Sequence, residues 1–438
     1  MISRRHALMS MLFGASAIGL RALATGLPAS LLLDPRRALA NVPPKGCGPD
    51  QKAQFVIFCT SSQGDPINAN CPGTYEEPGI FHSPDPAMAR TSITLGGQQH
   101  EAAMPWGTLP QEVLDRTCFF HLMTNTPIHP KEPDVLRLMH TTRGDEMLPS
   151  MLAKHLAPCL GTIQSRPISL ASSPSEGLTF SGQALPMIPA LALKATLTNP
   201  QGPLTNLQPL RDQSLNQIYG LYKNGASPAQ RAYIDSLVTS QSQVRNIRQE
   251  LLDDLLSITD NSAASQILAA VTLFQMKVTP VVAIRIPFGG DNHRDNGLAK
   301  ETAETISGVA TIASLMQKLA AANLADQVTF MSLNVFGRTL GGNSADGRSH
   351  NPNHQVSIVI GKPFRAGVIG GVGPIDKDYG ALPIDSKTGK GALEGDIPAA
   401  STLASYGRTM MAAFGVDPSV ISAEITSGQV ISPALAER

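Results

Sequence analysis

The stretch Val281–Gly361 opens with the apolar run VVAIRIPF (281–288) and the polar loop GGDNHRDN (289–296). It continues with a helical pattern over 299–322, the apolar run QVTFMSLNVF (327–336), the loop GRTLGGNSADGRSHNPNH (337–354) and the apolar run VSIVIG (356–361). Short uninterrupted apolar runs are typical of strands buried on both faces of a sheet. A strand, a helix and a second strand in this order predict a right-handed parallel crossover unit.

The rest of the chain repeats this pattern. The apolar runs QFVIFCT (54–60) and TCFFHLM (117–123) predict two further buried strands. A shorter strand is expected at 167–171, and helices are expected from about Val135 and over 403–414. Buried strands that alternate with helices predict an α/β fold, with a mostly parallel central sheet flanked by helices.

The domain organisation follows from length and composition. The chain has 438 residues, of which 42% are hydrophobic, so it can bury a sizeable core. We interpret residues 41–438 as a single α/β domain. The pair Ser227-Pro228 is typical of a helix start, and the apolar residues after it recur at the spacing of one buried helix face. Residues 210–275 are therefore expected to form a helical insertion packed on the sheet.

Residues 1–40 have the features of a twin-arginine (Tat) signal peptide. The pattern Ser3–Leu8 contains Arg4 and Arg5, the apolar run MSMLFGASAIGL follows, and Ala38–Ala40 is a small-x-small cleavage signal. A membrane anchor is the alternative, but the apolar run ends before Arg21 and is short for a bilayer span. We expect export through the Tat translocase to the periplasm or beyond, with a mature chain that is not an integral membrane protein.

The composition excludes several classes of partner. The 34 Lys and Arg residues balance 34 Asp and Glu residues, and only 5% of the chain is aromatic, so nucleic-acid binding is not expected. No glycine-rich nucleotide-binding motif follows a strand. Cys59 and Cys118 lie in apolar runs and are expected in the core, whereas Cys47, Cys71 and Cys159 lie in loop-like sequence. Five cysteines permit at most two disulfides.

Polar side chains follow four of the predicted strands. If those strands are parallel, their loops meet at one edge of the sheet, where ligands of open α/β sheets bind. Carboxylates and imidazoles would then converge from distant positions, a combination that suits a divalent metal ion. The residues that these loops carry are Ser61, Ser62, Asp65, Asn68, His129, Asp291, His293, Asp295, Arg338, Asp346, His350 and His354.

Each of these residues also has an ordinary structural interpretation. Asp291 and His293 point to the same side of an extended loop, but most such pairs are solvated loop residues. His350 and His354 have the spacing of a helical pair, although Pro352 favours a loop, with His354 at the start of the next strand. His121 is expected to be a hydrogen-bonded core residue. The other histidines outside these loops are given the same structural interpretation, and they are His82, His100, His140 and His155.

Several motifs together resemble a known family. The chain looks like a Tat-exported family of unknown function that is related to the alkaline phosphatase and sulfatase superfamily. A loop histidine of that family corresponds to His129. The stretches that correspond to its other motifs are Ser62–Asn68, Met139–Thr142, Gly290–His293, Asn334–Thr339 and Gly347–His350. The resemblance covers most of the mature chain, is most specific over 287–373, and implies an alkaline-phosphatase-like or sulfatase-like fold.

The chain departs from the family pattern at positions that bear on metal binding. Val335 and Ser349 stand where the family has acidic residues, and a neutral hydroxyl is a poor substitute for a carboxylate ligand. Gly290 replaces a tryptophan, and Ser62 and Gln63 replace glycines of the first loop. These replacements make a degenerate, non-catalytic member of the family the alternative to an enzyme.

The resemblance and the loops together predict a metal-dependent hydrolase of phosphate or sulfate esters. The expected ligands of a divalent ion are Asp65, His129, Asp291, His293 and His350. Ser62, or its neighbour Ser61, is the nucleophile candidate, or else a turn residue. Arg338 either binds the anionic group of the substrate or forms a buried structural ion pair. The alternative function is a non-catalytic envelope protein that retains the fold for binding or assembly, so the partner is either a small anionic ester or another envelope protein.

Overall fold

The structure is a computed structural model, and it describes most of the chain. The described residues are 53–162, 164–171, 177–198, 249–341 and 346–437, with a few isolated helical positions between 213 and 231. The expected signal at 1–40, Cys47, the pair Ser227-Pro228 and, within the expected insertion at 210–275, residues 232–248 with several positions before them lie outside the described residues.

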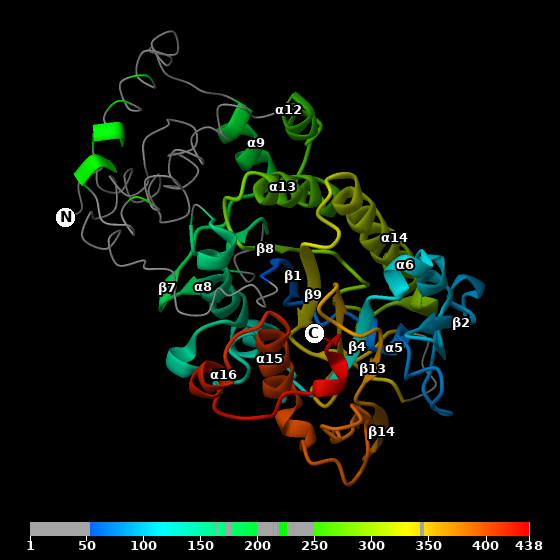
Figure 1. The fold of residues 1–438 in the computed structure, drawn as a ribbon. Coiled ribbons are helices and arrows are strands. Elements are labelled where there is room, and N and C mark those ends of the chain that lie inside the picture. The colour runs from blue at the N-terminus through cyan, green and yellow to red at the C-terminus, as the bar shows by residue number, and fades with distance from the viewer. Residues whose placement is uncertain are drawn as a thin grey trace, which may run out of the picture.

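A seven-stranded sheet forms the centre of the fold, with the strand order β13-β4-β12-β9-β1-β8-β5 (Figure 1). β1 is parallel to both of its neighbours, β8 and β9, and β12 alone is antiparallel to its neighbours, β4 and β9. The bounds are β1 Phe55–Ser61, β4 Thr117–Leu122, β5 Ile168–Ser169, β8 Val281–Ile284, β9 Val328–Asn334, β12 Gln355–Ile360 and β13 Gly367–Ile369. The prediction of an α/β fold with a mostly parallel sheet is confirmed.

Helices cover both faces of this sheet, which explains why its strands are uninterrupted apolar runs. The helices α13 (Ala263–Gln275) and α14 (Ala299–Ala321) lie on one side, and α8 (Leu148–Leu160) and α15 (Thr402–Ala413) lie on the other (Figure 1). Successive residues of β1 therefore point into two different cores. Ile57 packs in the core on the side of α14, and its neighbour Val56 packs in the core on the opposite face of the sheet. Each such fully buried side chain contributes roughly 1.5–3 kcal/mol to folding.

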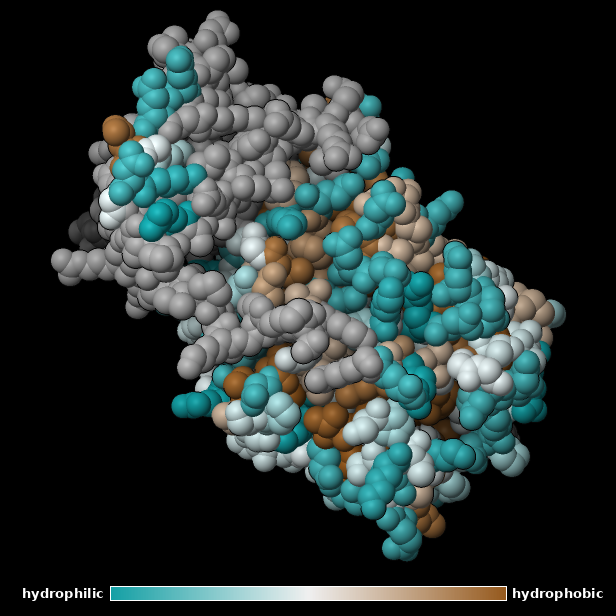
Figure 2. All heavy atoms as spheres, viewed as in Figure 1, coloured by the Kyte–Doolittle hydropathy of each residue, from teal (hydrophilic) through white to brown (hydrophobic). Residues whose placement is uncertain are grey.

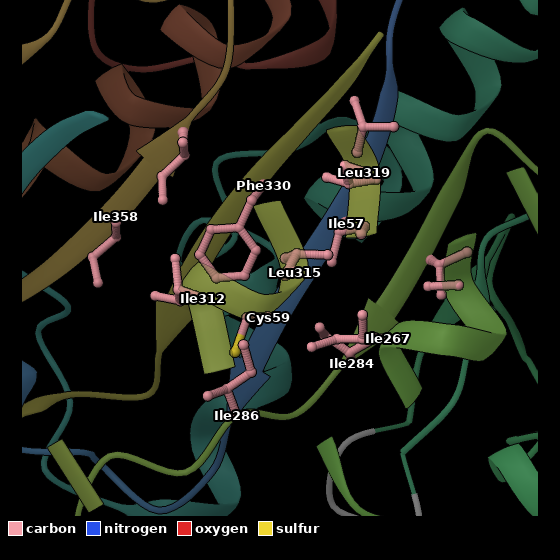
Figure 3. Close-up of a cluster of buried hydrophobic side chains, with 14 of the residues drawn as sticks. Ile57, Cys59, Ile267, Ile284, Ile286, Ile312, Leu315, Leu319, Phe330 and Ile358 are labelled. Carbon is pink, nitrogen blue, oxygen red and sulfur yellow. The ribbon is translucent and has the colours of Figure 1, made fainter. Parts of the chain in front are cut away.

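The first of these cores lies between the sheet and α14. Figure 3 shows Ile57 of β1 and Phe330 of β9 near Leu315 and Ile312 of α14. All of these side chains are inaccessible to solvent. The strand β8, the helix α14 and the strand β9 thus form the expected parallel crossover, and β1 lies between the two strands.

Smaller elements surround the sheet. The helices are α5 Ile67–Asn70, α6 Gln111–Leu114, α7 Glu132–Leu136, α9 Ala190–Thr198, α12 Gln249–Leu256 and α16 Pro418–Glu424. The strands pair as β2 Arg90–Leu95 with β3 Gln98–Ala103, β6 Thr179–Phe180 with β7 Gln183–Ala184, β10 Gly337–Arg338 with β11 His350–Asn351, and β14 Val372–Ile375 with β15 Asp378–Ala381.

One predicted helix is wrong in extent. The helix expected from about Val135 is the short α7, which ends at Leu136. It cannot continue because Leu138, Met139 and His140 all have positive φ angles, between 52° and 63°. Left-handed backbone of this kind costs L-residues about 1–2 kcal/mol each and is incompatible with a right-handed helix.

The cysteines and the surface complete the description. Cys59 and Cys118 are buried and free, as expected for core residues, and Cys71 is also buried and free despite its loop-like sequence. Cys159 is disulfide-bonded. Within the described part of the chain, no helix is both long enough and apolar enough to cross a membrane. Among the coloured residues of Figure 2 hydrophilic ones predominate, and hydrophobic ones gather mainly near the middle of this face.

Candidate metal centre

The predicted convergence of loops occurs at the carboxyl edge of the sheet. The strands β1, β4, β8 and β9 all point the same way, so the loops that follow them meet. His129 follows β4, Asp291 and His293 follow β8, and His350 comes from the hairpin β10–β11 after β9. Residues separated by up to 221 positions of sequence, such as His129 and His350, thereby become neighbours.

These four side chains can hold a metal ion. One ligand atom from each of His129, Asp291, His293 and His350 lies within 4.8 Å of every other. Oδ2 of Asp291 is 3.5 Å from Nε2 of His129, and Oδ1 is 3.5 Å from Nε2 of His293. Nε2 of His293 is 2.7 Å from Nε2 of His350. A tetrahedral site with bonds of about 2.0–2.1 Å separates its ligand atoms by roughly 3.3–3.4 Å, so small side-chain shifts suffice.

Two of the imidazoles are already oriented as ligands. Nδ1 of His129 is 2.7 Å from the carbonyl oxygen of Ser62, and Nδ1 of His350 is 2.5 Å from that of Pro127. A carbonyl oxygen only accepts, so each Nδ1 carries the proton and donates it. Each Nε2 then presents its lone pair to the cluster. Histidine ligands of metals are held by the same arrangement, in which the second ring nitrogen donates to a carbonyl or a carboxylate.

The electrostatics of the cluster favour the ligating forms of Asp291 and His350. Partial burial opposes ionisation of Asp291, but Arg338, His129 and His293 outweigh it, so the pKa of Asp291 lies below its usual value. Burial also lowers the pKa of His350, and the positive charge of Arg338 adds to this effect. A carboxylate and neutral imidazoles are the forms that bind metal ions.

Arg338 supports the cluster from the buried side, through its ion pair with Asp291. Its side chain is fully buried, and its Nη2 donates to Oδ1 of Asp291 at 3.0 Å. Its other hydrogen bonds go to the carbonyl oxygens of Gly64, Gln63 and Arg348. Every nitrogen of the guanidinium is therefore engaged within the protein. The sequence allowed Arg338 to bind an anionic substrate or to form a buried ion pair, and in the structure it forms the ion pair with Asp291.

The remaining predicted site residues lie beside the cluster rather than in it. Asp65 is buried and is not among the four clustered ligands. Its burial raises its pKa, and a hydrogen bond to Ser61 opposes that shift. Within the described residues, Oδ1 of Asp65 has no hydrogen-bond partner. Ser62 is buried too, and the group it offers to the cluster is its carbonyl oxygen.

The segment with Arg348, which precedes β11, is anchored by a buried ion pair. Arg348 donates from Nε and Nη2 to the two carboxylate oxygens of Glu301 in α14, at 2.8 and 3.2 Å. Asp295 accepts from the backbone nitrogens of Lys300 and Glu301, which fixes the start of α14 next to the cluster. Val335 is buried in the apolar core and supplies no ligand to the cluster.

Several residues that shape the site were not predicted. The ring of Phe336 packs against His350 and His129, with ring centroids 4.3 and 5.0 Å apart. The carbonyl oxygen of Pro127 orients His350, and no sequence signal marks a backbone carbonyl for this role. Nζ of Lys300 lies 3.5 Å from the carbonyl oxygen of Asp291. A lysine in the first turn of a helix carried no distinguishing signal.

The histidines expected to be structural lie outside the cluster. His82 is stacked on Tyr75 and hydrogen-bonded to the backbone of Ala69. His140 is exposed and lies beside Asp134 and Asp145.

No family model, curated protein or solved structure matches this chain. The chemistry of the cluster is therefore the basis for assigning a function.

Proposed function

We propose that this protein is a metal-dependent hydrolase of phosphate or sulfate esters, with the alkaline-phosphatase-like or sulfatase-like fold that its motifs suggest. The observation that carries the proposal is the cluster of three imidazoles and one carboxylate, two of whose imidazoles are already held as Nε2 ligands. Nitrogen ligands with one carboxylate favour Zn²⁺ over the harder Mg²⁺ and Ca²⁺. Bound there, a divalent ion supplies Lewis-acid chemistry, which activates water and offsets negative charge.

The charge balance of the cluster favours an anionic substrate. Arg338 is paired with Asp291, the one carboxylate among the four clustered residues, so little negative charge is left to compensate a divalent ion bound there. The side chains of Asp291 and His293 are 42% and 46% exposed, so an ester can approach from solvent. Arg338 is fully buried and uses four of its five N–H groups within the protein, so it is not placed to bind a substrate. Lys300 is exposed, and its ammonium group, near the carbonyl of Asp291, is placed to bind an anionic oxygen.

The same geometry bears on the nucleophile. Ser62 is buried, and its backbone carbonyl is occupied by His129, whereas the four ligand side chains line the exposed side of the cluster. We therefore favour water as the nucleophile.

A titration with Zn²⁺ and an ester assay test this function. We expect the purified protein, stripped of metal, to bind one Zn²⁺ and then to hydrolyse an aryl phosphate or an aryl sulfate. His293→Ala removes an exposed ligand with little effect on folding and should weaken both properties by at least tenfold. His140→Ala is the matched control, because His140 is an equally exposed histidine beside carboxylates but outside the cluster. Absence of Zn²⁺ binding by the wild-type protein would refute the proposal.

A non-catalytic binding protein is the second candidate. It is favoured by Ser349, which provides no carboxylate, and by Asp65, which lies outside the cluster. Under this alternative the wild-type protein binds Zn²⁺ without hydrolysing either ester. Ser349→Asp would then place an acid next to His350, and a gain in metal affinity or turnover in this variant would identify a site that has lost activity.

We also propose export by the Tat pathway. The support is the sequence Ser3–Leu8 with its following apolar run, and a metal centre built from distant loops is suited to a route that carries folded proteins. Replacing Arg4 and Arg5 by lysine should retain the protein in the cytoplasm, as measured by cell fractionation. Unchanged export of this variant would contradict the proposal, and Arg36→Lys serves as the control.

A further inference from the structure

Two histidines outside the metal cluster form a buried pair. His121 lies in β4, and His354 lies just before β12. Both are completely buried, and Nδ1 of His121 is 2.8 Å from Nε2 of His354. Burial lowers the pKa of both residues, to about 4 for His121, so both rings are neutral at physiological pH. Buried polar groups are costly unless they are hydrogen-bonded, so their partners define what the pair does.

The partners allow only one arrangement of protons. Nε2 of His121 is 2.9 Å from the carbonyl oxygen of Pro72, so it must carry a proton. Nδ1 of His121 is then an acceptor, and Nε2 of His354 donates to it. Nδ1 of His354 must in turn accept, and it does so from Nδ2 of Asn68, at 3.3 Å. The carbonyl oxygen of Pro72 thus determines which nitrogen carries the proton in both histidines, and the hydrogen-bonded chain of His121, His354 and Asn68 has one possible direction.

At its other end the chain holds the hairpin of the metal cluster. Oδ1 of Asn68 accepts from the backbone nitrogen of Arg338 at 2.9 Å, and Nδ2 donates to the carbonyl oxygen of Arg338 at 2.8 Å. Arg338 is paired with His350 across β10 and β11. A Cβ atom on Gly337 would lie 2.2 Å from the carbonyl oxygen of His354, so the hairpin and the chain are in close contact.

We propose that the chain Asn68–His354–His121 sets the metal affinity of the cluster by fixing the hairpin that carries Arg338 and His350. This inference rests on the proposed metal centre. Asn68 and His354 are positioning residues, because they touch no ligand atom of the cluster and act through the backbone of Arg338. Fully satisfied buried networks of this kind make one arrangement of the backbone strongly preferred.

Asn68→Asp tests the proposal with a minimal change in shape. A carboxylate accepts from the backbone nitrogen of Arg338 but cannot donate to the carbonyl oxygen of Arg338 or to His354. If His354 carried its proton on Nδ1 instead, Nδ1 of His121 would have to donate to His354, and Nε2 of His121 would then have no proton for the carbonyl oxygen of Pro72. We expect the Zn²⁺ affinity of the variant, measured by competition with a chromophoric chelator, to fall about 10- to 100-fold, as for other outer partners of metal ligands.

Ile358→Ala separates positioning from loss of stability. Ile358 is buried in β12 and belongs to the apolar core beneath the sheet, so its truncation destabilises the fold without touching the chain of hydrogen bonds. We expect this variant to bind Zn²⁺ within twofold of the wild type. An affinity of Asn68→Asp within twofold of the wild type, or an equal loss in both variants, would overturn the proposal.

Nitrogen-15 NMR of the histidine rings provides a measurement that needs no variant. We expect His121 and His354 as neutral Nε2–H tautomers and His350 as the Nδ1–H tautomer in the metal-free protein. An Nδ1–H tautomer of His354 would overturn the inference. If the wild-type protein binds no Zn²⁺, the proposed function fails, and the ring shifts of His350 in Asn68→Asp decide the inference separately: unchanged shifts contradict it, and shifted ones support it.

Discussion

At the scale of single residues, the candidate site depends on which atom of each side chain is engaged by the protein. The carbonyl oxygens of Ser62 and Pro127 take the Nδ1 protons of His129 and His350 and leave Nε2 available. Arg338 takes one oxygen of Asp291 and keeps it ionised. The ligating atoms are thus selected by backbone groups and by one buried cation rather than by the ligand residues themselves.

Arg338→Lys tests the role of the buried guanidinium. A lysine retains the charge but cannot reach Asp291 and the surrounding carbonyl oxygens together. We expect the free energy of unfolding to fall by about 2 kcal/mol, since several buried hydrogen bonds to a charged group are lost, and the Zn²⁺ affinity to fall with it. Urea unfolding measures the first quantity. Arg365→Lys, in an exposed pair with Glu437, should change neither, and an unaltered Arg338→Lys variant would contradict this role.

Lys300→Met tests whether the exposed ammonium group binds the anion. We expect the inhibition constant of inorganic phosphate, or of sulfate for a sulfatase, to rise roughly three- to tenfold, as for the loss of one exposed charge contact. The Zn²⁺ affinity should not change, because Lys300 contributes no ligand. Lys318→Met, near the opposite end of α14, is the control. A constant that is unchanged in Lys300→Met would assign anion binding to another residue.

At the scale of elements, the short hairpin β10–β11 is the critical part of the site. It contains only Gly337–Arg338 and His350–Asn351, yet it supplies a ligand and the cation that orients another ligand. The loop between its strands is tied to α14 by the ion pair of Arg348 and Glu301. The hairpin thus has little stability of its own and takes its position from the surrounding structure.

Gly337→Ala tests that dependence. The added Cβ atom would lie 2.2 Å from a backbone oxygen of His354, so the hairpin must shift. Overpacking of this kind costs about 1–3 kcal/mol of stability, and we expect a loss of Zn²⁺ affinity as well. In Gly371→Ala the new Cβ meets its nearest neighbour at an ordinary 3.4 Å, so this control should be tolerated. Equal metal binding by Gly337→Ala and the wild type would show that the hairpin is not critical.

At the scale of the whole molecule, the protein contains histidines that are neutral because they are buried. Burial lowers the pKa of His121 and of His82 from 6.5 to about 4, and it also holds the pKa of His354 well below 6.5. In the unfolded chain these residues bind protons near pH 6.5, whereas in the folded protein they do not. The unfolded state therefore takes up more protons between pH 6.5 and 4, and stability falls as the pH falls through this range.

We predict a marked loss of stability at mildly acidic pH. From the shift of His121 alone, the free energy of unfolding should fall by about 2 kcal/mol between pH 7.5 and pH 5. Asp65 acts in the opposite direction, because its raised pKa favours folding at low pH, but it is a single group. Urea unfolding at pH 7.5, 6 and 5 measures the effect. A stability that is constant over this range would contradict the prediction.

Much of the fold could be predicted from local sequence. The apolar runs that became β1, β4, β8 and β9 had to be buried on both faces, and this requirement predicts a parallel sheet covered by helices. It also places the loops after these strands at one edge. The failure after Leu136 has a local cause, since left-handed backbone at non-glycine residues leaves little signature in sequence.

The sequence by itself determined the mostly parallel character of the sheet and the set of loops that carry His129, Asp291, His293 and His350, but not the antiparallel direction of β12. Only the tertiary structure decided that Asp65 stays apart from them and that Arg338 turns inward. The physical reason is the difference between local and long-range interactions along the chain. Burial patterns are set by neighbouring residues, whereas a ligand set depends on distances of a few ångströms between side chains far apart in the chain, which packing and backbone carbonyl groups fix together.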